Sequence, residues 1–440
     1  MLKRLRLRLR KLLRESARKL ISWLPRQKRF EVFRSFANCD PAPSERLVLK
    51  IAETKEELEA CFSVLHDAYV DSGFMKPDPS GMRVTIYHAL PTTITLCAKY
   101  DGEVVGTISL IRESALGFPL QQIFDLTSVR KKEGLIAEVS ALAINRKFRR
   151  TGGTILFPLM KFMYEYCTTF FDTRHLVIAV NPSHIEMYES LLFFQRLTAN
   201  VVENYDFVNG APAIGATLDL KEAVNVMRQH YASKPARRNL YAYFTEIKLP
   251  NIQFPSRRFY TTNDPVLTPA LIDYFFNVRT HAFENLSERK KALLHTIYDL
   301  PEYRAVLPAP ASPEDSPLRR HERFSVKCPG RITYTTADGK QGKISIKVIE
   351  VSSDGFQALA HGVLPLNTWC EATIKLGHAD VSSVSAFILR EKRSEARGLY
   401  GFRLAEPDLN WRKFVSALHG SKIYSDLDNA TRFLESRFNH

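Results

Sequence analysis

The residues with the clearest chemical potential lie in one stretch, Ala137–Leu159 (AEVSALAINRKFRRTGGTILFPL). A strand-like apolar run there carries a single carboxylate, Glu138, and leads into a basic, glycine-containing turn that opens a helical pattern. Such a turn directs free backbone N–H groups and the positive end of the helix dipole toward a phosphate. A basic turn before a helix is equally typical of a solvated cap. The residues that would form the phosphate site are Arg149, Arg150, Thr151, Gly152, Gly153 and Thr154.

This turn resembles the acyl-donor pyrophosphate loop of the GNAT N-acyltransferase superfamily, Arg/Gln-x-x-Gly-x-Gly/Ala, although Thr154 stands at the last position. Further short segments accompany it in a fixed order: His66–Val70 with Gly73-Phe74, Gly106-Thr107, Leu116–Pro119, Ala137–Ser140, Asn181–His184 with Tyr188, and Val208–Ala213. Together they are similar to the FeeM-type N-acyl amino acid synthases, a GNAT branch akin to the acyl-homoserine-lactone synthases. The resemblance implies a long-chain acyl thioester of acyl carrier protein or coenzyme A as donor, and the amine of an amino acid or related molecule as acceptor. Ala141 replaces an arginine that often follows the family's Glu-x-Ser stretch, so the acceptor is left open.

That chemistry needs a group that takes a proton from the amine and a group that protonates the leaving thiolate. Glu138 is the candidate base or amine-orienting group, because burial in an apolar strand raises the pKa of a carboxyl; an ion pair with a neighbouring arginine is the alternative. His184 follows Pro182-Ser183 at a predicted strand-to-helix turn and could relay a proton or simply cap the helix. Tyr188 lies one helical turn further on the same face and could protonate the thiolate or pack in the core. Tyr69, on the first long predicted helix, is expected to be structural.

The elements that must position these residues follow from apolar periodicity. Strands are predicted over 46–51, 93–100, 103–111, 136–144, 174–180 and 213–220, and helices over 54–69, 154–171 and 183–194. Asp101-Gly102 between two apolar runs predicts a hairpin, and Thr54 with Glu57 has the spacing of a helix start. The pattern predicts a mixed α/β domain over 46–222, in agreement with the GNAT resemblance.

The rest of the chain divides by composition. Residues 223–306 read as a helical extension, with helices over 269–282 and 286–300, and residues 307–318 (LPAPASPEDSPL) form a proline-rich linker. Short β-rich runs separated by Gly, Asp and Asn turns predict an all-β barrel over 319–408, followed by a helical tail over 409–440.

The start of the predicted barrel carries two short motifs. Arg319 and Arg323 form R-x-x-x-R around Arg320, and Glu350-Val351-Ser352-Ser353-Asp354-Gly355 follows. The pair resembles the PilZ domain, whose second motif is Asp/Asn-x-Ser-x-x-Gly. The resemblance implies that cyclic-di-GMP is the regulatory ligand of the residues Arg319, Arg320, Arg323, Glu350, Ser352 and Gly355. Arginine forks suit this ligand because they bind phosphates bidentately and stack on guanine. Glu350 departs from the family pattern, and a barrel with a merely solvated basic face is the alternative.

The charge of the chain is concentrated at its beginning. The formal net charge is +15, and residues 1–36 hold 13 Lys and Arg against two Glu. Leucines recur there at helical spacing opposite the basic residues, a pattern typical of a basic amphipathic helix in the plane of an anionic membrane. Packing on the chain itself, or on nucleic acid or another partner, are the alternatives. Because the rest of the chain is nearly neutral, no nucleic acid is expected as a ligand of the whole protein.

Six scattered cysteines without Cys-x-x-Cys or zinc-ligand spacing predict reduced, buried thiols and no metal site. No bound cofactor is expected. The sequence thus predicts a bacterial signalling enzyme, an N-acyltransferase of the cytoplasm, peripheral at the inner face of the cytoplasmic membrane and regulated by cyclic-di-GMP. A non-catalytic, membrane-associated cyclic-di-GMP effector with a degenerate acyltransferase domain is the main alternative. An acyl-homoserine-lactone synthase that uses S-adenosylmethionine is a weaker third.

Overall fold

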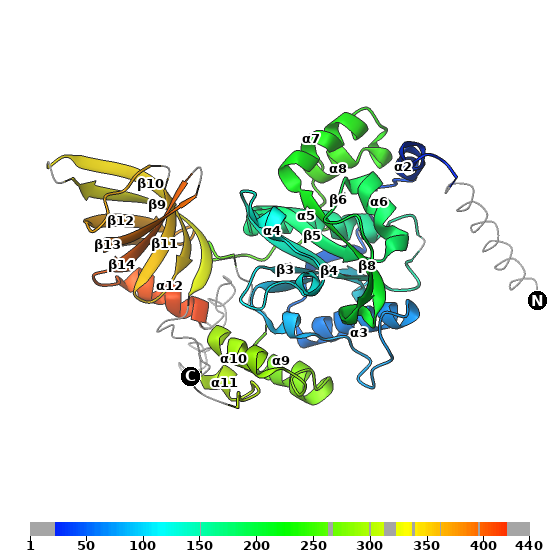
Figure 1. Ribbon diagram of the computed structural model, residues 1–440, viewed down its shortest axis with the longest axis horizontal. Helices are drawn as coiled ribbons and strands as arrows, with labels where there is room; N and C mark the ends of the chain where they lie inside the picture. The colour runs from blue at the N-terminus through cyan, green and yellow to red at the C-terminus, as the bar shows by residue number, and fades with distance from the viewer. Residues whose placement is uncertain are drawn as a thin grey trace, which may run out of the picture.

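The computed structural model describes residues 23–149, 151–262, 267–298, 301–311, 323–336, 339–360, 362–394 and 397–419. Arg150, Arg319, Arg320 and most of the predicted membrane-surface segment lie outside these ranges. Two β-structures organise the described chain, an open sheet with helices on both faces and a closed barrel (Figure 1). All six cysteines are buried and unpaired, as the sequence predicted.

The open sheet has eight strands. Its order is β1 (Leu47–Ile51), β2 (Thr93–Tyr100), β3 (Glu103–Arg112), β4 (Leu135–Ile144), β5 (Thr173–Val180), β8 (Ala211–Asp219) and β6 (Gln195–Arg196), with β7 (Val202–Tyr205) also paired to β8. The ladder between β4 and β5 is parallel, and every other pair is antiparallel. The predicted hairpin is present, because Asp101 and Gly102 both adopt the positive φ that its turn requires. This mixed sheet with flanking helices confirms the predicted fold class.

Helices cover the two faces of the sheet. On one face lies α3 (Lys55–Asp71), which begins at Thr54, whose side chain accepts a hydrogen bond from the Glu57 N–H as the sequence predicted. On the other face lies α5 (Leu156–Phe170), with α6 (Pro182–Leu192) and α7 (Leu220–Tyr231) further along the sheet. Short helical segments join these elements: η1 (Ile86–Ala89), η2 (Pro119–Gln122), α4 (Thr127–Arg130), η3 (Asp206–Val208) and η4 (Ala236–Arg238).

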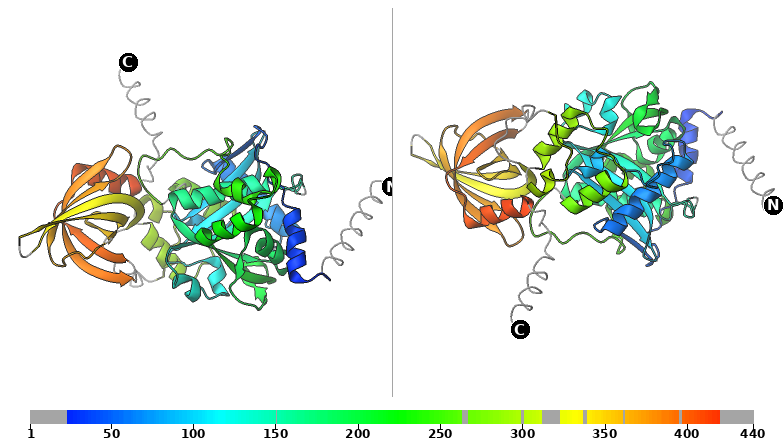
Figure 2. Two further views of the ribbon diagram at one scale, coloured as in Figure 1. Left: turned by 90° about the horizontal axis from the view of Figure 1, so that it is seen from above. Right: turned by 90° about the horizontal axis from the view of Figure 1, so that it is seen from below.

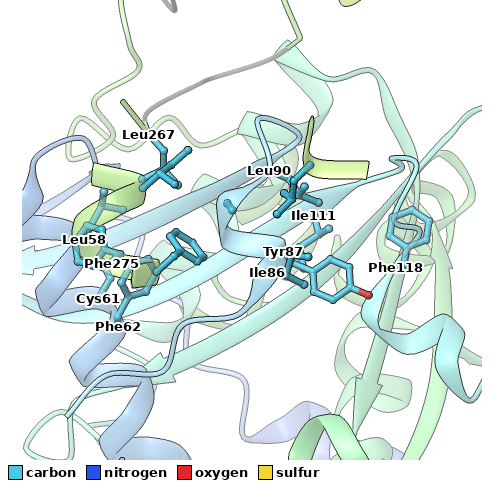
Figure 3. Close-up of a cluster of buried hydrophobic side chains, with 14 of the residues drawn as sticks. Leu58, Cys61, Phe62, Ile86, Tyr87, Leu90, Ile111, Phe118, Leu267 and Phe275 are labelled. Atoms are coloured by element: carbon cyan, nitrogen blue, oxygen red, sulfur yellow. The ribbon is translucent and has the colours of Figure 1, made fainter. Parts of the chain in front are cut away.

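The core on the α3 face extends into the later part of the chain. Phe62 of α3 makes an edge-to-face contact with Phe275, which comes from the segment after α9 (Pro269–Ile272) (Figure 3). The sequence predicted one α-helix over 269–282, whereas α9 continues as a π-helical segment, η5 (Asp273–Arg279), in which the adjacent Phe275 and Phe276 are both fully buried. The remaining helices of this core are α10 (Glu288–Ile297) and α11 (Pro301–Arg304), whereas α8 (Leu240–Thr245) packs with α5 and α7 on the opposite face.

The second β-structure confirms the predicted all-β barrel. Its strands are β9 (Phe324–Thr335), β10 (Gln341–Val351), β11 (Gly355–Ala360), β12 (Trp369–Lys375), β13 (Val381–Ser394) and β14 (Arg397–Leu404), closed in the order β10-β11-β14-β13-β12-β9. The helix α12 (Leu409–His419) packs on the barrel, and the indole of its Trp411 donates a hydrogen bond to the Ser352 carbonyl.

Among the described residues, the contacts between the barrel and the rest of the chain include an extended segment and a group of ion pairs. Residues 254–262, which the sequence assigned to a helical extension, run extended, and Phe259 and Thr261 form β-bridges to Gly377 and Val326 of the barrel. In addition, Lys327 of β9 and Lys347 of β10 both pair with Asp172, which immediately precedes β5. These contacts connect the barrel to the strand that borders the site described below.

The N-terminal part of the described chain packs on the opposite end of the molecule from the barrel (Figure 1, Figure 2). The helix α2 (Arg26–Ser35) lies against α6, where Arg26 pairs with Glu189 at 2.8 Å and Arg29 pairs with Glu186 at 2.6 Å. The residues of α2 therefore pack on the chain itself, which was one of the alternatives to a membrane surface. They belong to the segment 1–36 that was expected at a membrane. Within the described helices, none is long and apolar enough to cross a bilayer.

Candidate active site

The sheet opens between β4 and β5. Their parallel ladder runs only from Leu135 opposite Thr173 to Glu138 opposite Val177, although both strands continue beyond it. Directly after the ladder β4 contains a bulge in its pairing with β3, and Ala141 adopts a φ of 53° there. A bulge bends its strand and interrupts the regular pairing, so β4 turns away from β5 at this point.

A cavity of about 450 Å³ occupies the opening and extends to both faces of the sheet. Toward α3 its lining includes the polar residues Tyr69, Ser72 and Tyr205 beside apolar residues such as Ala68 and Phe74. Toward the opposite face the lining is mostly apolar and comes from α5, α6, α7 and α8. Its apolar residues include Met160, Met163, Leu192, Ala223, Val224, Met227 and Phe244, and Tyr164 and Thr245 lie beside them. The cavity therefore joins a polar end and an apolar end through the sheet.

Glu138 lies at the last rung of the ladder, where the strands separate. Its side chain is 2% exposed, and its Oε2 accepts a hydrogen bond of 3.1 Å from the Leu120 N–H. Burial raises the pKa of this carboxyl to about 8, against the opposing effect of that hydrogen bond. Within the described chain no arginine or lysine pairs with it. Glu138 does not line the cavity, but the cavity-lining Tyr69 is near enough that the Glu138 charge adds to the rise in the pKa of that tyrosine that burial causes.

His184 and Tyr188 both line the cavity from α6. Asn181 caps this helix by accepting a hydrogen bond from the Ser183 N–H at 3.0 Å, and Pro182 occupies the first helical position. His184 is exposed at the helix start, whereas Tyr188 is half-buried. Burial raises the pKa of Tyr188 to about 12, so this hydroxyl keeps its proton at neutral pH.

The predicted phosphate turn joins β4 to α5. Gly152 and Gly153 have φ values of 74° and 90°, and a Cβ on Gly153 would lie 2.4 Å from the Phe157 ring. Arg149 is half-buried and lines the cavity, and its guanidinium donates to the Ile144 carbonyl at 2.7 Å and pairs with Asp71 at 2.9 Å. The hydroxyls of Thr151 and Thr154 donate to backbone carbonyls within the turn. The positive φ values thus favour glycine at positions 152 and 153, and the Phe157 ring leaves no room for a side chain at position 153. The Arg149 guanidinium is already paired with the Asp71 carboxylate.

In the barrel, two of the predicted dinucleotide-binding residues contact each other. The guanidinium of Arg323 donates to the Glu350 carboxylate at 2.7 Å, at the point where β9 and β10 lie together. The Ser352 N–H and hydroxyl both donate to the Gly355 carbonyl, at 2.8 and 3.2 Å. A Cβ on Gly355 would lie 2.3 Å from the Phe402 carbonyl oxygen, so the close approach of β14 leaves room only for a glycine at position 355 of β11. No cluster of metal-ligating side chains occurs among the described residues.

Sequence reasoning missed Tyr205 and set Tyr69 aside as structural. Tyr69 lines the cavity, and so does Tyr205, whose residue is 2% exposed and whose hydroxyl finds no hydrogen-bond partner in the described chain. Tyr205 ends β7, a strand of four residues that carries no recognisable pattern. Only the fold brings it beside α3.

Residues 60–219 match the family model described as N-acyl amino acid synthase FeeM. Among solved structures, FeeM from uncultured soil microbes is 25% identical, with 41% of this chain and 93% of that chain covered and a TM-score of 0.34. The CoA-dependent acyl-homoserine lactone synthase BjaI, with MTA, is 18% identical, with 47% and 93% covered and a TM-score of 0.34. YcgR from Escherichia coli in complex with c-di-GMP is 16% identical, with 28% and 50% covered and a TM-score of 0.20. No curated protein matches the chain.

The matched segment begins in α3 and ends with β8, so it contains both strands that border the cavity as well as Glu138, the phosphate turn and Tyr188. Residues 60–219 are therefore an N-acyltransferase domain similar to the N-acyl amino acid synthase FeeM.

Proposed function

We propose that the chain transfers a long-chain fatty acyl group from acyl carrier protein, or from coenzyme A, to the amine of an amino acid or related acceptor. The observation that supports this most strongly is the cavity through the opened sheet, which is polar at one end and apolar at the other. A fatty acyl chain suits the apolar end because burying it removes apolar surface from water. The acceptor then enters from the polar end, and the two meet between β4 and β5.

In the proposed reaction the amine nitrogen attacks the thioester carbonyl, so a C–N bond forms and the C–S bond breaks. The amine proton passes to Glu138, and because Glu138 lies behind the cavity wall, a group between them relays it; the Tyr69 hydroxyl is the candidate for this relay because Tyr69 lines the cavity. The leaving thiolate takes a proton from the Tyr188 hydroxyl. His184 stands at the exposed end of α6 and orients the donor, while the turn from Arg149 to Thr154 holds its phosphate.

The apolar end of the cavity sets the acyl chain length in this account. Its far lining comes from α7 and α8, which lie beyond the last residue of the family match. Met227 and Phe244 are buried there, and Lys161 of α5 ties α8 in place by donating to the Phe244 carbonyl at 3.4 Å. The chain-length preference is therefore a property of this chain's own helices.

A bulkier residue at Val224 is expected to shorten the accepted chain. Val224→Phe should lower the rate with a palmitoyl thioester relative to an octanoyl thioester by about tenfold or more, since overpacking a filled site costs about 1–3 kcal/mol. Val226→Phe is the matched control, because Val226 is also half-buried on α7 but does not line the cavity. Kinetics with the two thioesters provide the measurement. Equal effects of the two substitutions would contradict the assignment of the apolar end.

Regulation by cyclic-di-GMP is the second part of the proposal, and the contact at Asp172 supports a route for it. Arg323 comes four residues before Lys327 on β9, and Glu350 comes three residues after Lys347 on β10. Both lysines pair with Asp172, and β5 starts at the next residue and lines the cavity further on. A ligand that breaks or moves the ion pair between Arg323 and Glu350 would therefore act on β9 and β10, the strands that carry the two lysines.

Asp172→Asn is expected to leave cyclic-di-GMP binding unchanged and to reduce the effect of the dinucleotide on the transfer rate several-fold. Asparagine tolerates the φ of 51° at this position, so the substitution removes only the charge. Asp101→Asn is the matched control, since Asp101 has a φ of 52° and pairs with Arg46 in a distant hairpin. Transfer rates with and without cyclic-di-GMP check this. A full response in Asp172→Asn would rule out the contact as the route.

A non-catalytic effector is the second candidate function. Ala141 and Thr154 depart from the family pattern, and Arg149 of the phosphate turn is paired with Asp71. In that case the chain binds cyclic-di-GMP and passes the signal to a partner, while the part of the basic segment before α2 holds it at an anionic membrane surface.

The experiment that separates the two functions uses the purified full chain. It is incubated with palmitoyl-acyl carrier protein or palmitoyl-CoA and a mixture of amino acids, and N-acyl products are measured by mass spectrometry. An N-acyl amino acid supports the transferase and identifies its donor. Absence of any product with either donor, with or without cyclic-di-GMP, would favour the effector.

A further inference from the structure

Two exposed aromatic residues flank α2, at the end of the molecule opposite the barrel (Figure 1, Figure 2). Trp23 is 89% exposed shortly before the helix begins, and Phe36 is 70% exposed directly after it ends. Single exposed apolar residues are common on protein surfaces and need no partner. These two indicate a binding surface because they stand beside concentrated positive charge.

The chain directly after Phe36 is fastened to η4. The Cys39 N–H donates a hydrogen bond of 2.8 Å to the Arg237 carbonyl, and the Arg237 guanidinium pairs with Asp40 at 3.4 Å. Cys39 and Arg237 are 198 residues apart in the sequence, so only the fold brings the end of α2 beside η4.

Positive charge is concentrated at η4. Residues 223–245 contain four Lys and Arg and no Asp or Glu. Lys234 and Arg238 are exposed, and in the described part of the chain neither of them pairs with a carboxylate. The 22 residues before Trp23 add nine Lys and Arg against one Glu. An anionic partner suits such a surface. The basic aromatic face is formed by Trp23, Phe36, Lys234, Arg237 and Arg238.

The basic aromatic face lies over the apolar end of the cavity. Ala37 and Cys39, which follow Phe36, are buried in one cluster with residues that line that end, Met160, Met227 and Phe244. A fatty acyl chain in the apolar end would therefore lie under this face. The product of the proposed transferase carries that chain, and a long acyl chain partitions into a bilayer.

We propose that the basic aromatic face binds the surface of an anionic phospholipid bilayer. Basic side chains are attracted to anionic headgroups, and aromatic side chains are enriched at the level of those headgroups. Acidic acyl carrier protein is the rival partner, but a contact between charged surfaces gives no role to Trp23 and Phe36. The binding itself does not depend on catalysis. Only its purpose, to release a lipid product where it partitions, rests on the proposed transferase function.

The test measures binding of the purified full chain to vesicles by co-sedimentation. The wild type should bind vesicles of phosphatidylcholine with phosphatidylglycerol much more tightly than vesicles of phosphatidylcholine alone, and high salt should weaken this binding by screening. Lys234→Ala combined with Arg238→Ala should lower the partition coefficient about 10- to 30-fold, since each basic residue near an anionic surface contributes about fivefold. Phe36→Ala should lower it several-fold, because less apolar surface leaves the water.

The barrel, at the other end of the molecule, provides matched controls. Lys343→Ala combined with Lys375→Ala removes two exposed charges from its strands, and Val363→Ala shortens an apolar residue that is as exposed as Phe36. These variants should bind the anionic vesicles as the wild type does.

A tryptophan placed on the face reports directly whether it enters the bilayer. Phe36→Trp is made in a Trp23→Phe background, and its emission is recorded with vesicles whose lipids carry bromine, a quencher, on their acyl chains. The emission should be quenched. Val363→Trp in the same background should not be quenched, and Trp369 and Trp411 contribute equally to both variants.

Three results would overturn the proposal. The wild type fails to bind the anionic vesicles, or the substitutions at Lys234, Arg238 and Phe36 leave that binding unchanged, in which case the segment before Trp23 accounts for it alone. In the third, these substitutions abolish binding of acyl carrier protein and leave vesicle binding intact, which would assign the face to that protein. Because no acyl donor is present, failure of the transferase function does not alter these measurements and is recognised separately, as absence of any N-acyl product.

Discussion

Glu138→Gln is expected to lower the rate of acyl transfer by about 10²- to 10⁴-fold, the usual contribution of a general base. Glutamine keeps the size of the side chain and an oxygen for the Leu120 N–H, but it cannot accept the amine proton. Steady-state kinetics of the purified chain give the measurement. Glu133→Gln is the matched control, because Glu133 is exposed just before β4. A less than threefold loss in Glu138→Gln would remove Glu138 from the chemistry.

The activity and the stability of the wild-type chain should both depend on pH, because burial raises the pKa of the Glu138 carboxyl to about 8. Activity depends on the ionised form, so the rate of the wild type should rise with pH through about 8. Stability has the opposite sign: between pH 4.5, the ordinary pKa of a glutamate carboxyl, and about pH 8, the folded chain holds a proton that the unfolded chain releases. The free energy of unfolding should therefore fall as pH rises through that window, and this component should be absent in Glu138→Gln.

The second large effect concerns the barrel. Arg323→Ala is expected to weaken cyclic-di-GMP binding by about 10- to 100-fold, because a charged donor to phosphate contributes about 1.5–3 kcal/mol. The loss also leaves Glu350 without its partner, and that carboxylate then repels the phosphates. Calorimetric titration with cyclic-di-GMP checks the prediction. Arg331→Ala is the control, because Arg331 is an exposed arginine of β9, the strand that begins directly after Arg323. Equal affinity in both variants would mean that the barrel has only a solvated basic face.

Local signals in the sequence predicted most of the open sheet. Thr54 begins α3, and Asp101-Gly102 makes the hairpin, because both depend on neighbouring residues alone. The barrel was predicted in the same way, from short β-rich runs separated by Gly, Asp and Asn turns. The π-helical segment was missed because periodicity cannot show that Phe275 and Phe276 will both be buried between α3 and the later helices.

The candidate site was predictable only in part. Glu138 and the phosphate turn occupy one continuous stretch, so their relation was visible in the sequence. The polar end of the cavity was not visible in the sequence, because Tyr69 and Tyr205 lie more than a hundred residues apart and come together only when β7 packs beside α3. The pattern of α7 shows which face is buried but not that this face borders a cavity.

The most direct test of the central claim is lipid mass spectrometry of a heterologous bacterial host that expresses the wild-type chain or Glu138→Gln, each with and without raised cyclic-di-GMP. The account predicts a new N-acylated amino acid in cells with the wild type only, in an amount that changes with the dinucleotide. No new lipid under either condition, or the same lipid in equal amount from Glu138→Gln, would contradict it.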